Sequence, residues 1–173
     1  MELFLVRHAM PEVDPHRSPD SWRLSREGRI AARALRADLP RTPTAVSSPE
    51  IKAVETLALG IDRPADRIVT DDGFAEVLRP GEPFDDEVAA RRRAWVEGRL
   101  DGRHDGWETP GEAATRMQSA IDRHRPERAA LVVATHGMAM TAWLTACGHV
   151  ADGAAAGEFW SQLRFPDVIR LGI

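Results

Sequence analysis

Two histidines in this chain each come directly after a short hydrophobic segment. Leu5-Val6 leads into Arg7-His8, and Val132–Thr135 leads into His136. In an open parallel sheet, ligands bind beyond the carboxyl ends of the strands. The two imidazoles therefore meet at that edge if their strands are neighbours. A single histidine after a strand is more often an ordinary loop residue, so the pair carries more weight than either member.

A third segment adds positive charge to the same expected edge. Thr44–Ser47 reads as a strand, and Ser48-Pro49 after it is a typical helix start, with serine as N-cap and proline in the first turn. Lys52 falls in that first turn, where free backbone N–H groups and a cation favour anions. Arg7 adds a planar fork suited to phosphate oxygens. From the residues alone we expect an oxyanion pocket containing two histidines, although a Ser-Pro pair is often only a cap.

The elements that must position these residues alternate between strands and helices. Strands are predicted at residues 3–6, 44–47, 67–70, 129–135 and 168–171, and helices at 26–38, 48–60, 84–99, from 110 onward and at 137–147. Thr109 and Glu112 have the spacing of a capping box, and Ile30 is expected on the buried face of its helix. The Gly/Ala-rich stretch 151–157 is predicted to be a loop. Alternating elements of this kind favour a mainly parallel sheet covered on both faces.

Composition sets the class of protein. With 173 residues, 43% of them hydrophobic, the chain is predicted to form a single domain spanning residues 1–173. The net charge of −4 and the scattered arginines disfavour a nucleic acid or an anionic membrane as partner. No signal peptide or membrane-spanning stretch is recognisable, and the single Cys147 excludes an intramolecular disulfide. A cytoplasmic protein is therefore expected.

Lysine is unusually rare. Of 23 basic residues, only Lys52 is a lysine, and it does not follow a glycine, so a Walker A phosphate loop is absent. A codon bias that favours arginine explains the arginines but not the retention of this one lysine.

Four motifs, in this order, resemble those of the histidine phosphatase superfamily, the phosphoglycerate-mutase-like group. They are LVRHA at 5–9, LSREG at 24–28, SSPEIKAVET at 47–56 and VATHG at 133–137. Each is short, but four in family order form a specific pattern. The resemblance implies a three-layer α/β/α sandwich with a mainly parallel central sheet, and transfer of a phosphoryl group through a phosphohistidine.

The family roles carry over residue by residue. His8 is then the nucleophile, and Arg7, Lys52 and His136 surround the phosphoryl oxygens, with His136 also taking part in catalysis. No metal and no other cofactor is implied, because the cationic pocket takes the part that magnesium plays elsewhere. The family places a carboxylate in a Gly-Leu/Phe-x-Glu context after the third strand. Glu76 fits this context and is expected to protonate the leaving oxygen and then to activate water; nearby Asp71, Asp72 and Glu82 read as ordinary surface acids.

Three positions depart from the family pattern. Ala9 replaces a glycine, which is tolerable if its backbone is not left-handed. Asp14 stands where many members have an asparagine that helps to hold phosphate, and it is expected to point elsewhere or to meet His16 or Arg17. Lys52 replaces the more common arginine and offers a point charge instead of a fork.

The expected function is that of a metal-independent phosphomonoesterase acting on a small phosphorylated substrate. The substrate is predicted to enter over Arg17, Trp22, Arg79 and the segment around Trp107, although both tryptophans also read as packing residues. The short acidic stretch after the third strand favours a phosphatase over a phosphomutase. The alternatives are a phosphomutase and a module that binds phosphorylated ligands with little turnover. A metal site formed by the two histidines is disfavoured because no other ligand lies at suitable spacing, and the sequence does not indicate the oligomeric state.

Overall fold

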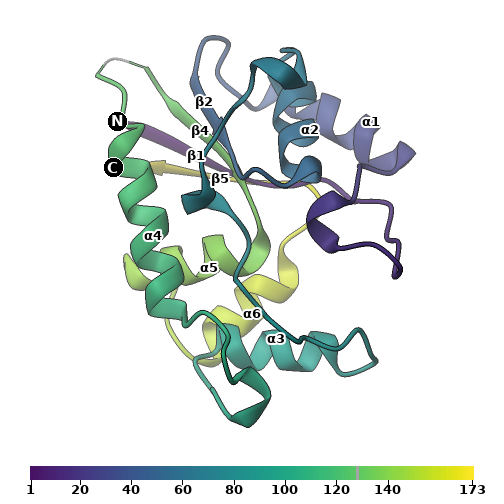
Figure 1. Cartoon of the computed structure of the whole chain (residues 1–173). Helices are drawn as coiled ribbons and strands as arrows, with labels where there is room; N and C mark the ends of the chain where they lie inside the picture. Colours follow the sequence, from purple (N-terminus) through teal and green to yellow (C-terminus); the bar gives the residue numbers. More distant parts are fainter. Residues whose placement is uncertain (128) are drawn as a thin grey trace.

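A computed structural model of the chain describes residues 1–127 and 129–173. Its strands form one sheet in the order β3-β2-β4-β1-β5 (Figure 1). The strands are β1 (Glu2–Arg7), β2 (Thr44–Ser47), β3 (Val69–Thr70), β4 (Leu131–Thr135) and β5 (Asp167–Gly172). Neighbouring strands run parallel except at β5, which is antiparallel to β1. The predicted mainly parallel sheet is confirmed.

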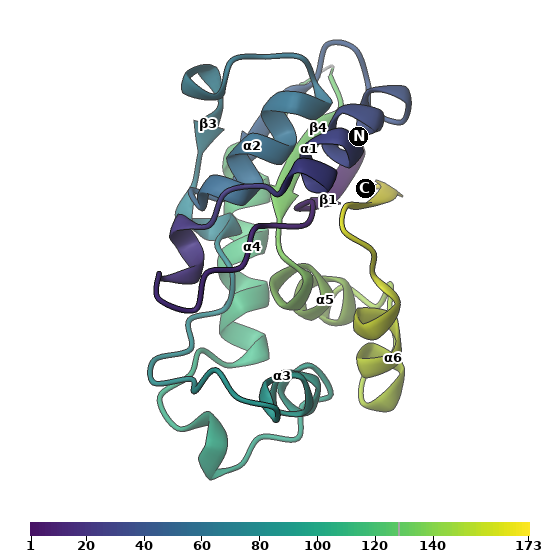
Figure 2. The ribbon, with the colours of Figure 1, turned by 90° about the vertical axis from the view of Figure 1, so that its right-hand side faces the viewer.

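Helices cover both faces of this sheet, which gives the expected three layers (Figure 1). The helices are α1 (Arg26–Ala34), α2 (Ile51–Gly60), α3 (Val88–Val96), α4 (Pro110–Arg123), α5 (Gly137–Ala146) and α6 (Ala154–Gln162). Helices α1 and α2 pack together on one face, and α4 and α5 on the other. Helices α3 and α6 contact each other and α5, and they lie away from α1 and α2 (Figure 2).

Strand β1 shows why the sheet is buried on both sides. Leu3 and Leu5 belong to the core beneath α4 and α5, whereas Phe4 and Val6 belong to the core beneath α1 and α2. Successive side chains of a strand point to opposite faces, so a strand covered twice needs a continuous hydrophobic run. The run Leu3–Val6 at the start of the sequence meets this requirement.

The two ends of the chain lie side by side, because β1 and β5 are neighbours (Figure 1). The Met1 amino group donates to the Ile173 carbonyl at 2.6 Å. Among the helices described, none combines the length and the apolar character needed to span a membrane.

Several predicted element boundaries are wrong. The stretch predicted as a loop at 151–157 contains the start of α6, which begins after Gly153, a residue with φ of +64°. The side chain of Ile30 is 60% exposed, and the buried positions of α1 are Gly28 and Ala32. Helix α3 is shorter than the predicted 84–99, and β3 contains only two residues.

Helix starts were predicted with mixed success. The capping box before α4 is confirmed: the Thr109 side chain accepts from the Glu112 N–H, and the Glu112 side chain accepts from the Thr109 N–H. Helix α2, by contrast, has Glu50 as its N-cap residue, and Ser48 lies outside it. The Ser48 hydroxyl accepts from the Glu50 N–H at 3.2 Å, just before the helix, and it also lies 2.8 Å from His136 Nε2.

Candidate active site

The two histidines predicted at strand ends lie close together, with their ring planes tilted by 59°. Strands β1 and β4 are adjacent and parallel, with Arg7 opposite Thr135. The backbone N–H of His8 donates to the Thr135 carbonyl at 3.1 Å, so the pairing continues to the first residue beyond β1. The ring centroids of His8 and His136 are 5.1 Å apart. The order of the strands therefore brings together residues that are far apart in the sequence.

The contacts of His8 fix which nitrogen carries its proton. Nδ1 lies 2.8 Å from the carbonyl oxygen of Ala9, and a carbonyl only accepts, so Nδ1 is the protonated nitrogen. The lone pair is then on Nε2. Burial, together with the neighbouring His136, Lys52 and Arg7, lowers the pKa of His8 to about 3, against the opposing effect of the hydrogen bond to Ala9. The imidazole is therefore neutral at physiological pH.

His136 is completely buried and is held by the segment that connects β2 to α2. Its Nε2 lies 2.8 Å from Ser48 Oγ and 3.3 Å from Glu50 Oε1. Burial lowers the pKa of His136 to about 3; the carboxylate of Glu76 opposes this shift and the charge of Lys52 adds to it. Its Nδ1 has no hydrogen-bond partner within residues 1–127 and 129–173.

Lys52 lies at the start of α2, as predicted, and its ammonium group is buried. Nζ donates to the Pro19 carbonyl at 2.7 Å and forms an ion pair with Glu50. The ammonium group of Lys52 thus makes two contacts. One is to the turn 19–21 in the loop after β1, and the other is to the Glu50 carboxylate, which also lies near His136. The charge of Lys52 contributes to the low pKa of both histidines.

Arg7 is packed from three sides. Its Nη1 donates to the Leu163 carbonyl at 2.5 Å, and its guanidinium carbon lies 3.5 Å from the centre of the Phe165 ring. A Cβ at Gly137 would lie 3.2 Å from Arg7 Nε, so the glycine allows the close approach of the guanidinium. Burial lowers the pKa of Arg7 to about 10, with Glu76 and Asp167 opposing, and the group stays charged at neutral pH. Nε has no partner in the described part of the chain.

Glu76 faces the start of α5. Its Oε1 accepts from the backbone N–H of Val77 at 2.9 Å and of Ala139 at 3.1 Å. Burial by itself raises the pKa of a carboxyl, but the charge of Arg79, with His136 and the Val77 hydrogen bond, outweighs it and lowers the pKa of Glu76 to about 2. Glu76 is therefore ionised in the ligand-free protein.

Arg116 on α4 holds the loop that carries Glu76. Its guanidinium donates to the carbonyls of Gly73 and Ala75 at 2.9 Å each and to that of Glu76 at 3.3 Å. A Cβ at Gly73 would lie 2.5 Å from the Cβ of Ala120, so this loop packs directly on α4. The Gly73–Glu76 context that marks Glu76 in the sequence thus reflects a close backbone approach.

Of the residues predicted along the substrate's path, the structure separates Arg79 from the others. The Arg79 guanidinium is mostly buried, donates to Glu82 Oε2 at 3.0 Å and contributes to the low pKa of Glu76. It therefore belongs to the interior of the site, and the acid Glu82, predicted to be ordinary surface, is its partner. Arg17 is exposed on the loop after β1.

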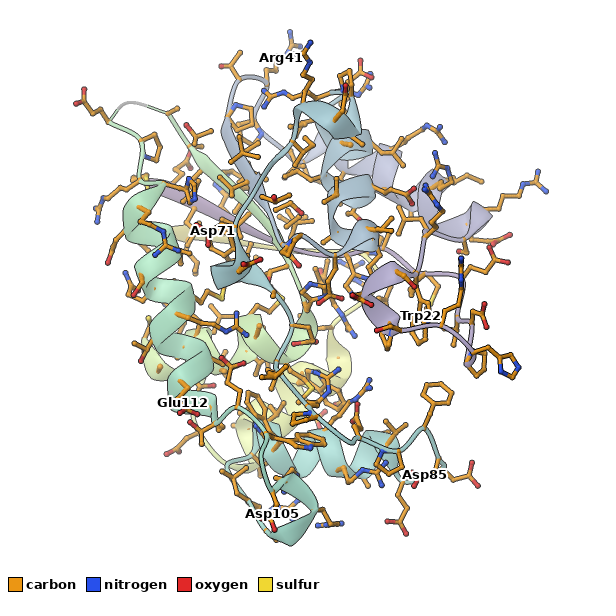
Figure 3. The ribbon with its side chains drawn as sticks, viewed as in Figure 1. Trp22, Arg41, Asp71, Asp85, Asp105 and Glu112 are labelled. Carbon is orange, nitrogen blue, oxygen red and sulfur yellow. The ribbon has the colours of Figure 1, made fainter. Side chains whose placement is uncertain are left out.

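Trp22 connects two loops on the same side of the molecule. Figure 3 shows Trp22 after β1 and Asp85 before α3, and the ring of Phe84 meets that of Trp22 edge to face with centroids 6.4 Å apart. Phe84 remains 61% exposed. The indole N–H of Trp22 donates to the Asp14 carbonyl at 2.9 Å, which fixes the loop after β1.

The structure also tests the predictions for Trp107, Ala9 and Asp14. Trp107 is buried in a hydrophobic cluster with Trp95, so it is a packing residue. Ala9 has no positive φ, and its N–H donates to Thr56 Oγ1 at 2.9 Å. Asp14 meets His16, as expected, through a hydrogen bond from the His16 N–H at 2.9 Å.

Sequence reasoning did not find three residues of this site: Glu50, Phe165 and Arg116. Glu50 occupies an unspecified position of the Ser-Ser-Pro motif, Phe165 lies in the loop before the last strand, and Arg116 is one of many arginines. A carboxylate placed two residues before the only lysine was the one available signal. Among the residues described, no group of three or more His, Cys, Asp or Glu could hold a metal ion.

Comparison with known proteins identifies the family pattern over most of the chain. The model of the histidine phosphatase superfamily (branch 1) matches residues 3–159. No curated protein matches the chain.

Solved structures share the fold at low identity. The mycobacterial glucosyl-3-phosphoglycerate phosphatase is 19% identical, with a TM-score of 0.70 over 98% of this chain and 88% of that one. Phosphoserine phosphatase from Entamoeba histolytica, solved with phosphoserine, is 13% identical, with a TM-score of 0.69 over 98% and 89%. A protein from Thermus thermophilus is 25% identical, with a TM-score of 0.60 over 86% and 85%.

Proposed function

The chain belongs to the histidine phosphatase superfamily, and from this premise we propose that it is a metal-independent phosphomonoesterase that acts through phospho-His8. The observation that carries the proposal is the state of His8. Its Nδ1 proton is held by the Ala9 carbonyl and its pKa is lowered to about 3, so Nε2 has a free lone pair at neutral pH. An imidazole in this state is a nucleophile that needs no base to activate it.

The first step forms a bond between His8 Nε2 and phosphorus while the bond from phosphorus to the leaving oxygen breaks. Negative charge spreads over the three equatorial oxygens, and fixed cations and N–H donors stabilise it. Arg7, Lys52 and His136 supply these groups in the proposal. The buried Arg7 Nε, which lacks a partner among the described residues, is a donor available to an oxyanion.

Glu76 serves the leaving group and then the water. The phosphoryl dianion raises the pKa of a neighbouring carboxyl, so substrate binding favours proton uptake by Glu76, whose pKa is about 2 in the free protein. The proton passes to the leaving oxygen in the first step. In the second step, the ionised Glu76 accepts a proton from water as the water oxygen attacks phospho-His8, which releases inorganic phosphate and restores neutral His8.

The substrate is proposed to be a small phosphate monoester. The phosphatases with similar folds are named for phosphoserine and glucosyl-3-phosphoglycerate, both small phosphorylated compounds. On the side of the leaving group, the Trp22–Phe84 pair offers an aromatic surface and Arg17 an exposed cation. The short segment between β3 and α3 favours a phosphatase over a phosphomutase.

The test uses an aryl phosphate and an alkyl phosphate in the presence of a strong chelator. Wild type is expected to hydrolyse both, and mass spectrometry after an acid-free quench should find phosphate on His8. His8→Ala should lose turnover, whereas His16→Ala, which removes an exposed histidine of the loop after β1, should retain it. Glu76→Gln should impair the alkyl ester more than the aryl ester, because an aryl oxide leaves without a proton.

Two results would contradict the proposal. Full turnover by His8→Ala would exclude a phosphohistidine at this residue. Tight binding of phosphate esters by the wild type, without hydrolysis of either, would instead favour a module that binds phosphorylated ligands.

A further inference from the structure

Glu50 places a carboxylate inside the pocket that the proposed mechanism assigns to phosphate. It is the N-cap residue of α2, yet its side chain makes no capping hydrogen bond. The side chain is only 13% exposed, and it turns toward Lys52 and His136. The carboxylate is in a position to cap α2, but it contacts Lys52 and His136 instead.

Three polar groups from three different elements surround this carboxylate, and Lys52 and the Glu76 N–H donate to it. Lys52 Nζ on α2 forms an ion pair with Oε2, the N–H of Glu76 donates to Oε1 at 3.1 Å, and His136 Nε2 after β4 lies 3.3 Å from Oε1. A cation, a backbone N–H and an imidazole around one oxyanion form the kind of donor set that holds phosphoryl oxygens.

Two of these groups, Lys52 and His136, are phosphate ligands in the proposed function. The carboxylate therefore stands where an oxygen of the phosphoryl group would bind, and it neutralises the charge of Lys52. A phosphoryl dianion that arrives at Lys52 and His136 meets the negative charge of Glu50, with which Lys52 is already paired. The two anions repel each other and compete for the charge of Lys52.

We propose that Glu50 is an internal competitor for the phosphoryl pocket and sets its affinity for phosphate. This inference rests on the proposed function, because it takes Lys52 and His136 as phosphate ligands. The anion binds only when the Glu50 carboxylate has moved away from Lys52 and His136. The apparent affinity is therefore the intrinsic affinity multiplied by the fraction of molecules in which the carboxylate has moved away. The extended backbone at Glu50, with φ of −64° and ψ of 133°, lets the side chain turn away without unwinding α2.

The same competition applies to inorganic phosphate and to phosphate esters. Inorganic phosphate brings only its own oxygens and has to displace Glu50 with them alone. A phosphate ester brings additional contacts through its leaving group, for example on Trp22 and Phe84, and these contacts offset the cost of displacement. Glu50 therefore lowers the apparent affinities for product and for substrate by the same factor, and the contacts of the leaving group decide how much more tightly the ester binds.

The test is direct binding of inorganic phosphate and of orthovanadate, measured by titration calorimetry at one pH near neutrality. Glu50→Gln keeps the shape but removes the charge, and it should bind both anions about tenfold more tightly than wild type or better. Glu27→Gln removes an exposed carboxylate on α1 and should bind as the wild type does. Inhibition of ester hydrolysis by phosphate should strengthen in parallel in Glu50→Gln.

Unchanged or weaker binding by Glu50→Gln would overturn the inference, since it would mean that Glu50 positions Lys52 for the anion instead of competing with it. If Glu50→Gln does not fold, Glu50→Asp, which withdraws the charge by one methylene, should still gain affinity, and failure to do so refutes the idea equally. The outcomes separate from those for the proposed function, because binding is measured without turnover. Hydrolysis that depends on His8, together with no gain in Glu50→Gln, leaves the phosphatase proposal standing and removes this one.

Discussion

Acidification should unfold this protein because two neutral histidines lie in its interior. His8 is buried with 7% of its surface exposed, and His136 is completely buried. The pKa of each is lowered from 6.5 to about 3, and burial is the main cause. The two rings lie 5.1 Å apart and near the charge of Lys52, so protonation of either is unfavourable in the folded state. In the unfolded chain both are solvated and titrate near the ordinary value.

The direction and size of the effect follow from proton linkage. Below pH 6.5 the unfolded chain binds a proton at His8 and at His136, whereas the folded chain binds these protons only near pH 3. The free energy of unfolding is therefore unaffected by the two residues above pH 6.5 and decreases as the pH falls below it. Between pH 7.5 and pH 4.5 each histidine should lower the free energy of unfolding by about 2–3 kcal/mol, and the pair by about 5 kcal/mol. That is a large share of the roughly 5–15 kcal/mol by which a domain is stable.

Carboxylates do not obscure this window. Glu76 has a pKa lowered from 4.5 to about 2, so the stability it contributes is present above pH 4.5 and is lost only at lower pH. The interval from pH 7.5 to pH 4.5 therefore isolates the histidines. The free energy of unfolding should be measured by urea denaturation at several pH values across it.

His8→Asn separates the contribution of one ring, because the variant retains only His136 as a buried imidazole at the site. Its free energy of unfolding should fall over the same interval by about 3 kcal/mol less than that of wild type. The control His16→Asn, at an exposed position, should follow the wild-type curve. Equal slopes for wild type and His8→Asn would refute the reasoning, as would an imidazole signal of His8 that titrates near pH 6.5 in NMR spectra of the folded protein.

Two further predictions concern residues that shape the site. Lys52→Arg puts a larger head group where Nζ is enclosed by Pro19 and Glu50. Overpacking should lower the free energy of unfolding by about 1–3 kcal/mol, measured by thermal or urea unfolding, and should change kcat/KM for phosphate esters. A variant indistinguishable from wild type in both assays would show that the retained lysine has no local role. Arg116→Lys loses the planar guanidinium that holds the backbone carbonyls of the loop carrying Glu76. The kcat for an alkyl phosphate should fall about tenfold with KM little changed, whereas Arg123→Lys on the same helix should have little effect. An equal effect of the two substitutions would contradict a specific positioning role for Arg116.

Local rules predicted the elements whose ends are marked by side chains. The capping box of Thr109 and Glu112 fixes the start of α4 because it satisfies two backbone N–H groups within the same turn. The continuous hydrophobic runs of β1 and β4 are typical of strands covered on both faces. Both signals lie within a few residues and need no knowledge of the rest of the chain.

Other elements depend on packing that no local pattern reveals. Helix α6 is rich in alanine and glycine, and Gly157 lies so close to Glu97, near the end of α3, that a Cβ there would clash with the Glu97 carboxylate. The glycine at 157, one of the small residues that suggest a loop, thus allows the close contact between α6 and Glu97. Ser48 was predicted to be the N-cap of α2. It lies just before the N-cap residue Glu50, and its hydroxyl contacts both the Glu50 N–H and His136, which follows a distant strand.

The sequence by itself determined which residues stand at the ends of strands and that the chain alternates between strands and helices. It therefore indicated His8, His136 and Lys52 as members of one edge, because the direction of a parallel sheet puts all strand ends together. Only the tertiary structure decided that β4 lies between β2 and β1, so that the two rings are 5.1 Å apart. It also decided that Glu50 enters the pocket, since long-range strand pairing and burial set both the neighbours and the proton affinity of each buried group.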